Sequence, residues 1–135
     1  MDEPEVWLIT GAGRGMGAEF AAAALGAGHA VIATGRRPAD VAQALGASDR
    51  LLVTTLDVTN LDDARAAVAA GVERFGRIDV VVNSAGASFK GYFEEMSPAQ
   101  VEQQLAVNLL GPMHVTRAVL PVMRRQRSGH LVAMR

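Results

Sequence analysis

The sequence predicts an α/β protein with a parallel sheet, and two observations carry this prediction. Short runs of β-type residues alternate with helical patterns along the whole chain. Strands of about five residues that are separated by helices imply βαβ units with right-handed crossovers. The second observation is compositional: of the 135 residues, half are hydrophobic and a fifth are charged, with no linker, repeat or low-complexity tract. We therefore expect one domain over residues 1–135.

The first half of the chain contains three predicted strands and two predicted helices. The strands cover residues 6–10, 30–35 and 51–58. An alanine-rich stretch after the first strand predicts a helix that stops near Gly26 and Gly28. A shorter helix is predicted over residues 38–45, because a proline suits the first turn of a helix.

The clearest helix of the second half follows Asn60. This residue is a suitable N-cap, apolar residues then recur at steps of three and four, and Gly76 is a suitable stop. A fourth strand is predicted within residues 78–86, where it runs out into a loop, and a fifth over residues 130–134.

A long helix is predicted between these two strands. Ser97 and Pro98 favour its start, as a cap and as a first-turn residue, and it ends near Arg127. Because Pro112 and Pro121 lie inside it and a proline cannot donate the helical hydrogen bond, we expect kinks or a break there.

Charge and composition exclude several classes of function. Thirteen basic residues against fourteen acidic ones give a net charge of −1, which offers no broad field for nucleic acid or for an anionic membrane. Without cysteine the chain has no disulfide, thiolate metal site or cysteine nucleophile. The first residues lack the features of a signal peptide, and no apolar run reaches the roughly 18 residues of a membrane span. We expect a cytoplasmic protein without a nucleic-acid or membrane partner.

A glycine-rich turn, TGAGRGMG at residues 10–17, joins the first strand to the first helix. In this position glycines permit a tight turn and the close approach of a pyrophosphate, and the helix offers free N–H groups at its positive end. Two registers are open: GxGxxA from Gly13 and GxxxGxG from Gly11. A Walker loop is excluded, because no Gly-Lys-Ser/Thr follows. The turn is typical of a Rossmann-type dinucleotide-binding domain.

The residues after the second strand indicate which dinucleotide would bind. An NAD site usually places an acid there, which accepts from the ribose 2′-OH. This chain instead has Arg36 and Arg37, and Arg14 in the glycine turn can approach the same position. A guanidinium matches a 2′-phosphate and gives an unphosphorylated ribose no acceptor. We therefore expect NADP(H), with no acid beside the 2′-phosphate.

Four motifs in the same order resemble those of the short-chain dehydrogenase/reductase family. The glycine turn is similar to the TGxxxGxG cofactor loop of the family, and LDV at 56–58 resembles the segment whose Asp contacts the adenine. NSAG at 83–86 resembles the family's NNAG, with Ser84 as a departure, and VN at 107–108 lies where the family carries an Asn of its catalytic tetrad. With the arginines, the resemblance implies a catalytic role for Asn108 and a cofactor site of Gly11, Arg14, Gly15, Met16, Gly17, Arg36, Arg37, Asp57, Val58, Asn83, Ala85 and Gly86.

The remaining catalytic residues of the family are the main departure. In the family, strand five leads into the catalytic Ser, and a Tyr-xxx-Lys pair follows on a later helix. Here the sequence ends at Arg135, about where that Ser is due, and the residue four places after Tyr92, the single tyrosine, is Met96. The single lysine, Lys90, lies in the same loop. We therefore expect a C-terminally truncated family member that is inactive as it stands. The three histidines, His29, His114 and His130, are scattered without ligand-type neighbours, so no metal site is expected.

The sequence thus predicts an incomplete Rossmann-type domain with an open parallel sheet in the order 3-2-1-4-5 and helices on both faces. The predicted function is NADP(H) binding within an oxidoreductase that transfers hydride between nicotinamide and a small carbonyl or alcohol. The alternative is a stand-alone NADP(H)-binding or assembly module without catalysis. Because residues 130–134 would form a poorly covered apolar edge strand, we also expect self-association.

Overall fold

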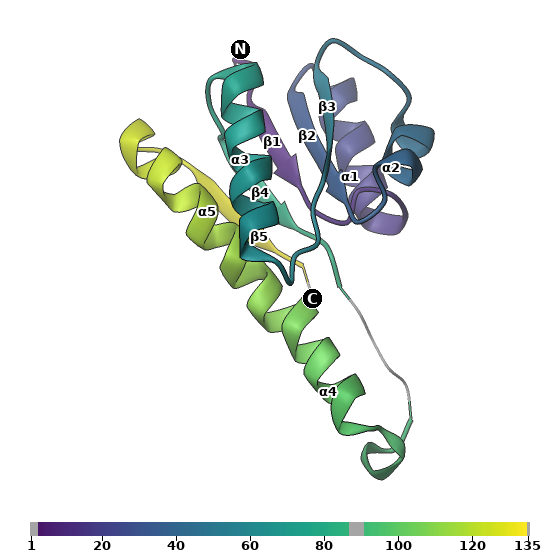
Figure 1. Ribbon diagram of the computed structural model, residues 1–135. Coiled ribbons are helices and arrows are strands. Elements are labelled where there is room, and N and C mark those ends of the chain that lie inside the picture. The colour runs from purple at the N-terminus through teal and green to yellow at the C-terminus, as the bar shows by residue number, and fades with distance from the viewer. Residues whose placement is uncertain (1–2, 87–90, 135) are drawn as a thin grey trace.

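The computed structural model describes residues 3–86 and 91–134, which form a five-stranded parallel sheet with helices around it (Figure 1). The strands are β1 (Val6–Ile9), β2 (Ala30–Gly35), β3 (Leu51–Thr55), β4 (Val80–Asn83) and β5 (His130–Ala133). The helices are α1 (Gly15–Gly26), α2 (Pro38–Leu45), α3 (Leu61–Phe75), α4 (Pro98–Leu105) and α5 (Gly111–Gln126), and a 3₁₀ turn covers Phe93–Glu95. The strand order is β3-β2-β1-β4-β5, and every pairing is parallel. The predicted fold class and strand order are confirmed.

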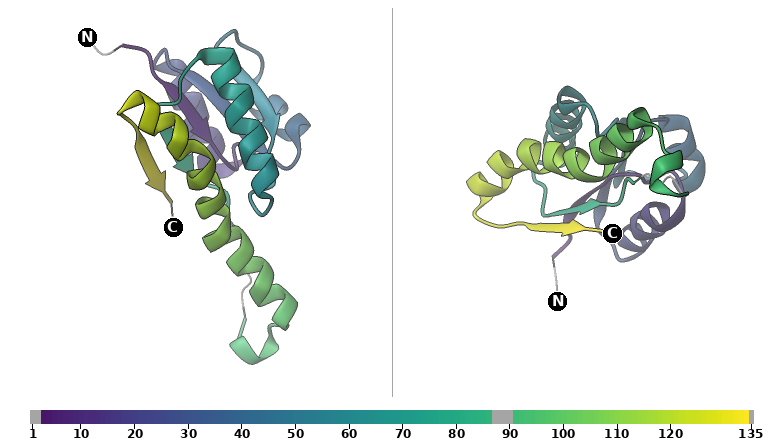
Figure 2. Two further views of the ribbon diagram at one scale, coloured as in Figure 1. Left: turned by 60° about the vertical axis from the view of Figure 1, so that its left-hand side comes forward. Right: turned by 90° about the horizontal axis from the view of Figure 1, so that it is seen from below.

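Helices cover both faces of the sheet, and each face has its own apolar core (Figure 2). The core under α3 and α5 includes Leu8, Ile32, Val68, Val81, Val115 and Val119. The core under α1 and α2 includes Ile9, Ala21, Val31, Val41 and Val82. Successive side chains of a strand point to opposite faces, so neighbours such as Leu8 and Ile9 divide between the two cores. The near-continuous apolar strands of the sequence are explained by this burial on both sides.

Helix α3 begins and ends where the sequence predicts. The Asn60 side chain accepts a hydrogen bond from the N–H of Asp63 at 3.2 Å. Gly76 ends the helix with a φ of 82°, a left-handed conformation that glycine adopts without a steric penalty. Within the helix, Gly71 allows close packing on β2, because a Cβ at this position would collide with Ile32.

The long helix predicted after Ser97 is present as one helical segment over residues 98–126. Ser97 forms a capping box with Gln100, whose N–H donates to Ser97 Oγ at 3.1 Å. By length and composition alone this helix could cross a membrane. That is weak evidence, because Val115 and Val119 of α5 are fully buried against the sheet, as in a core helix. The absence of a membrane partner stays a prediction.

A π-type turn, Ala106–Leu110, interrupts this helical segment between α4 and α5. There the N–H of Gly111 donates to Ala106 O, five residues back. Pro112 follows, and it has no N–H with which to close a regular turn onto Asn108 O, so the helix widens just before it. The predicted irregularity at Pro112 is therefore present, whereas Pro121 lies inside α5.

The edge formed by β5 is the least covered part of the sheet. All four residues of this strand are exposed, and Leu131 and Val132 keep 44% and 40% of their surface accessible. At the other end of the long helix, α4 extends away from the sheet (Figures 1 and 2), and Leu105 and Leu109 are more than half exposed. The predicted uncovered edge is confirmed, while the self-association inferred from it stays a prediction.

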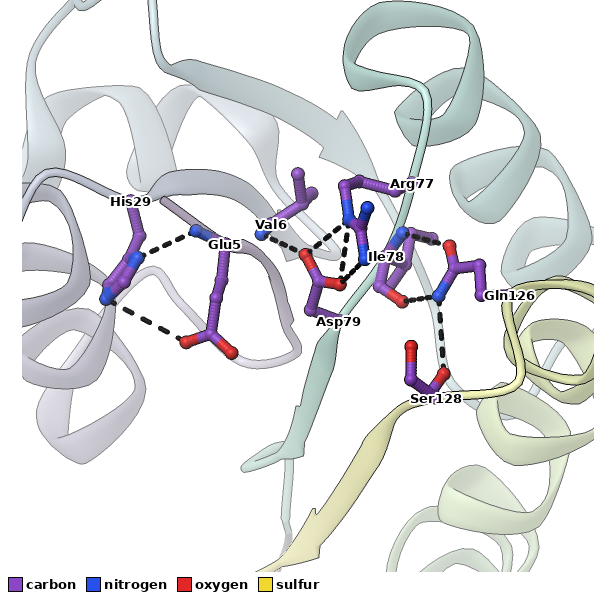
Figure 3. A network of polar contacts seen from close by, with 8 residues as sticks. All are labelled: Glu5, Val6, His29, Arg77, Ile78, Asp79, Gln126 and Ser128. Atoms are coloured by element: carbon purple, nitrogen blue, oxygen red, sulfur yellow. Dashed lines mark hydrogen bonds and ion pairs between the residues drawn. The ribbon is translucent and has the colours of Figure 1, made fainter. Parts of the chain in front are cut away.

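A polar network fixes the amino ends of the central strands (Figure 3). Asp79, which precedes β4, accepts a hydrogen bond from the N–H of Val6 at 2.9 Å and bonds from the Arg77 guanidinium at 2.6–3.0 Å. The Gln126 side chain binds both the N–H and the carbonyl of Ile78, at 3.0 and 2.8 Å. Burial raises the pKa of Asp79, but the bonds from Arg77 and Val6 outweigh it, so this pKa lies below its ordinary value.

Candidate functional site

A cleft of about 580 Å³ opens at the carboxyl ends of β1, β2 and β4. The chain runs from β1 to β2 on one side and β4 lies on the other side of β1, so the cleft lies where the strand order reverses. Such a switch point is the usual ligand site of open parallel sheets. Of the residues predicted to bind cofactor, all except Asn83 line the cleft. Residues outside the predicted cofactor set also line it, among them Gly35, Asp40, Val41, Ser84, Gln103 and Val107.

The glycine turn forms the floor of the cleft, and three glycines have distinct reasons to be there. Gly11 and Gly15 have φ values of 62° and 60°, which side-chain-bearing residues rarely adopt. A Cβ on Gly17 would collide with Gly11 O, so only glycine lets the first turn of α1 approach β1 this closely. By contrast, Gly13 has no left-handed φ, and a Cβ there would make only ordinary contacts of 3.6 Å or more. The GxxxGxG register therefore accounts for the turn better than the register that starts at Gly13.

Thr10 ties the glycine turn to the loop after β4. Its hydroxyl accepts hydrogen bonds from the N–H groups of Ser84 and Ala85, both at 3.0 Å. Gly11 follows, and a Cβ on it would lie only 2.9 Å from the Cα of Ala85. The two loops therefore lie against each other across the switch point. The sequence marks Thr10 only as part of the glycine motif, because a bond between residues 74 positions apart leaves no local pattern.

The segment after β3 forms a third wall of the cleft. The predicted strand to residue 58 ends at Thr55 in the structure, and Asp57 and Val58 lie in a turn instead. Asp57 Oδ1 accepts from the N–H and the hydroxyl of Thr59 at 2.9 and 2.7 Å. The hydroxyl bond lowers the pKa of Asp57, and although burial opposes it, the N–H bond and the charge of Arg36 lower it further, so this pKa lies below its ordinary value. Asp57 is therefore an ionised turn former on the cleft wall.

Three arginines and one unexpected acid share the end of the cleft beside α2. Arg14, Arg36 and Arg37 line it as predicted, and within the described part of the chain none of them forms an ion pair. The expectation that no acid lies near them is wrong, because Asp40 lines the same cleft. Its Cβ lies 3.6 Å from the position of a Cβ on Gly13. The error arose because α2 turns back over the glycine turn and brings its first-turn acid to the cleft.

Asn83 lies apart from the predicted set. It is the last residue of β4, only 6% exposed, and it borders a second hollow between α5 and β5 rather than the cleft. Its carbonyl accepts from the N–H of Met134, and its buried Oδ1 accepts no hydrogen bond from the described residues. Because side chains alternate along a strand, its neighbour Ser84 reaches the cleft where Asn83 does not.

Asn108 lies in the π-type turn, beside the loop after β4. Its Oδ1 is 3.5 Å from the position of a Cβ on Gly86, an ordinary contact distance, so the amide lies directly beside this loop. Its neighbours in the sequence are the apolar Val107 and Leu109, and Asn108 itself makes an interaction in the structure. It is nevertheless exposed, as are Leu109 and Leu110, because the helix here extends beyond the sheet.

The other candidate catalytic groups do not gather at the cleft. Tyr92 is 76% exposed ahead of the 3₁₀ turn and does not line the cleft, and Lys90 lies outside the described residues. His29 lies near the amino ends of the strands, where it accepts from the N–H of Glu5 at 2.9 Å. Over residues 3–86 and 91–134, no group of three acidic or histidine side chains is placed to hold a metal ion.

Comparisons with known proteins agree with the resemblance seen in the motifs. The profile of the family described as short chain dehydrogenase matches residues 5–135. Oxidoreductase BOA17 of Botryotinia fuckeliana is 40% identical over 129 residues, which cover 94% of this chain and 47% of that protein. The crystal structure of a short-chain dehydrogenase from Streptomyces avermitilis has a TM-score of 0.90 at 38% identity, covering 98% of this chain and 49% of that one.

A further crystal structure is similar and contains a cofactor. The 3-ketoacyl-(acyl-carrier-protein) reductase from Brucella melitensis, complexed with NADH, has a TM-score of 0.90 at 27% identity, covering 97% of this chain and 57% of that one. The chain spans about half the length of the curated relatives it matches.

Proposed function

The chain belongs to the short chain dehydrogenase family, and on that premise we propose that its cleft binds a nicotinamide dinucleotide as part of an oxidoreductase. The glycine turn carries the proposal. The position of a Cβ on Gly15 is open space at the cleft, and the first turn of α1 contains no acidic residue. The N–H groups and the positive end of the α1 dipole therefore favour the pyrophosphate of such a cofactor.

The chain's own residues would bind and orient the cofactor from three sides. The glycine turn holds the pyrophosphate, and the turn with Asp57 and Val58 faces the adenine, as the family resemblance implies. The loop with Ala85 and Gly86, fixed by Thr10, supports the nicotinamide side. When bound, the cofactor supplies or accepts the hydride. A small carbonyl or alcohol is the proposed substrate class of the whole protein.

We infer a preference for NADP(H) over NAD(H). Arg14, Arg36 and Arg37 supply guanidinium groups at one end of the cleft, and none is neutralised by an ion pair within the described residues. Guanidinium groups bind phosphate with charge-assisted hydrogen bonds. Asp40 opposes this preference, and the similar Brucella melitensis structure contains NADH. The preference therefore depends on the three positive charges outweighing the carboxylates of Asp40 and Asp57, which line the same cleft.

Titration of the chain with NADPH and with NADH tests both parts of the proposal. Calorimetry should show tighter binding of NADPH, by about tenfold for one charge-assisted phosphate contact. Arg36→Asp should narrow or invert the preference, while Arg125→Asp, an exposed change on α5 away from the cleft, should leave it unchanged. Equal affinity for both cofactors would overturn the NADP(H) assignment, and binding of neither would overturn the cofactor site.

We further propose that this chain alone does not reduce carbonyl compounds. Asn108 is the one residue assigned to the family's catalytic set, and general acid–base assistance alone contributes about 10²–10⁴-fold. NADPH oxidation over a carbonyl panel should stay at background. Turnover at rates usual for enzymes would contradict the proposal and reveal a catalytic group outside the family's set.

A stand-alone binding module is the second candidate function. It is favoured by two observations: three segments already form the cleft, and Tyr92 is exposed and does not line it. Coding sequence that continues in frame with a Ser and a Tyr-xxx-Lys pair would exclude this candidate and support the oxidoreductase.

A further inference from the structure

The cleft wall formed by Asp57 and Val58 is held in place from outside its own segment. Helix α3 contributes Asp63, whose carboxylate accepts from the N–H of Asp57 at 3.0 Å. Helix α5 contributes His114, whose Nδ1 lies 2.8 Å from the carbonyl oxygen of Val58. Residues in a loop lack the repeating bonds of a strand, so such contacts determine where the wall lies.

The direction of the His114 bond follows from its partner. A carbonyl oxygen can only accept, so Nδ1 of His114 must carry the proton and donate to Val58. The neutral Nδ1–H tautomer and the imidazolium both meet this requirement. The bond is part-buried and joins residues 56 positions apart in the sequence. Because Val58 itself is only 7% exposed, water has little access to replace the donor at this carbonyl.

Gly111 explains how α5 comes close enough for this bond. It precedes His114 by three residues, so both lie on one face of the helix. A Cβ on Gly111 would lie 2.7 Å from Cγ2 of Val58. Because Gly111 has no side chain, Val58 can pack against the helix, which brings its carbonyl within hydrogen-bond distance of His114.

We propose that His114 is a positioning residue for the cofactor: through Val58 it fixes the wall against which the adenosine half binds. This inference rests on the proposed function. The place of α5 does not depend on the imidazole, because Val115 and Val119 anchor the helix in the core and are fully buried. The position of the turn between β3 and α3 does depend on the imidazole, because without it the carbonyl of Val58 would lose its hydrogen-bond donor.

Three variants separate this role from a general effect on folding. His114→Leu removes the donor, and His114→Ala serves where leucine does not fit. His114→Asn keeps an N–H donor near the place of Nδ1, and His130→Leu changes an exposed histidine of β5 that does not line the cleft. The measurements are the dissociation constants of NADPH and 2′,5′-ADP, the urea unfolding midpoint, and amide hydrogen exchange over residues 57–60.

His114→Leu should weaken both ligands about fivefold, the value of one hydrogen bond, and should speed exchange over residues 57–60 in the free protein. His114→Asn should recover most of the ligand affinity and most of the protection from amide exchange over residues 57–60. His130→Leu should match the parent in both measurements. Parent-like affinity and exchange in a folded His114→Leu or His114→Ala variant would overturn the inference. A parent that binds neither ligand would instead overturn the proposed function, while the exchange data would still show whether His114 holds the turn.

Discussion

Gly15 and Gly11 form a matched pair in which one substitution should damage binding and the other folding. Both have a left-handed φ, of 60° and 62°. An alanine in this conformation costs about 1–2 kcal/mol at either position. The space around them differs: a Cβ on Gly15 would have no neighbour within 4 Å, whereas a Cβ on Gly11 would lie 2.9 Å from Ala85 Cα and 3.0 Å from its N.

The Gly11→Ala variant should therefore have a lower free energy of unfolding than the Gly15→Ala variant. Gly15→Ala should lose about 1–2 kcal/mol, which leaves a domain of ordinary stability folded. Gly11→Ala should lose about 1–3 kcal/mol more, because backbone atoms that cannot rotate away must shift to admit the methyl group. The loop after β4, which Thr10 ties to the glycine turn, would be displaced with them.

The substitution that damages NADPH binding most should be the one at Gly15, although the one at Gly11 costs more stability. The open space at Gly15 faces the cleft where we place the pyrophosphate, so Gly15→Val should abolish NADPH binding while the core stays folded. Urea unfolding followed by circular dichroism gives the stabilities, and calorimetric titration gives the affinities. The reasoning is refuted if Gly15→Val binds NADPH as tightly as the parent, or if Gly11→Ala is no less stable than Gly15→Ala.

Three further predictions concern charge and surface. Asp40→Asn should raise affinity for NADPH relative to NADH, by no more than about threefold because the carboxylate is exposed and screened; calorimetry that shows no change would place Asp40 outside the phosphate's reach. Asp79→Asn should lower the free energy of unfolding at pH 7 by about 1–3 kcal/mol, since Val6 and Arg77 lose a charged acceptor. The pKa of Asp79 is depressed in the folded state, so its contribution to stability is present above the ordinary Asp pKa and is lost as the pH falls below about 4. Urea unfolding at pH 7, 5 and 3 should therefore show the difference in unfolding free energy between parent and variant becoming smaller toward pH 3. A difference that stays constant with pH would contradict this. The isolated chain should self-associate through its uncovered edge, and Leu131→Lys should shift light scattering toward monomer; a parent that stays monomeric over the concentration series would show that this edge needs no partner.

Features that depend on short stretches of sequence could be predicted well. The bounds of β2 and α2, the Asn60 cap and the Gly76 stop were all expected, because each follows from local propensity or from one capping bond. The end of β3 was placed three residues late, since a buried apolar turn and a buried strand give the same pattern. Parallel order followed from the alternation of strands and helices together with the family resemblance.

Contacts between distant residues were beyond the reach of the sequence. Thr10 and His114 bind loop groups far along the chain, and Asp40 reaches the cleft because α2 packs beside the glycine turn. No period or motif marks such pairs, because they exist only once the sheet has brought the elements together. Asn83 was assigned to the cleft by motif, although the alternation of the strand turns it toward the other hollow.

The network around Asp79 has a consequence for how this domain can change over time. The bonds drawn in Figure 3 tie Val6, Arg77 and the end of α5 together at the amino ends of the strands. The cleft opens at their carboxyl ends, and none of the residues in this network lines it. Substitutions of exposed cleft residues such as Arg36 or Asp40 therefore leave the hydrogen bonds of this network intact. Evolution can therefore change the nucleotide preference at such exposed positions while the bonds that hold the amino ends of the strands together stay as they are.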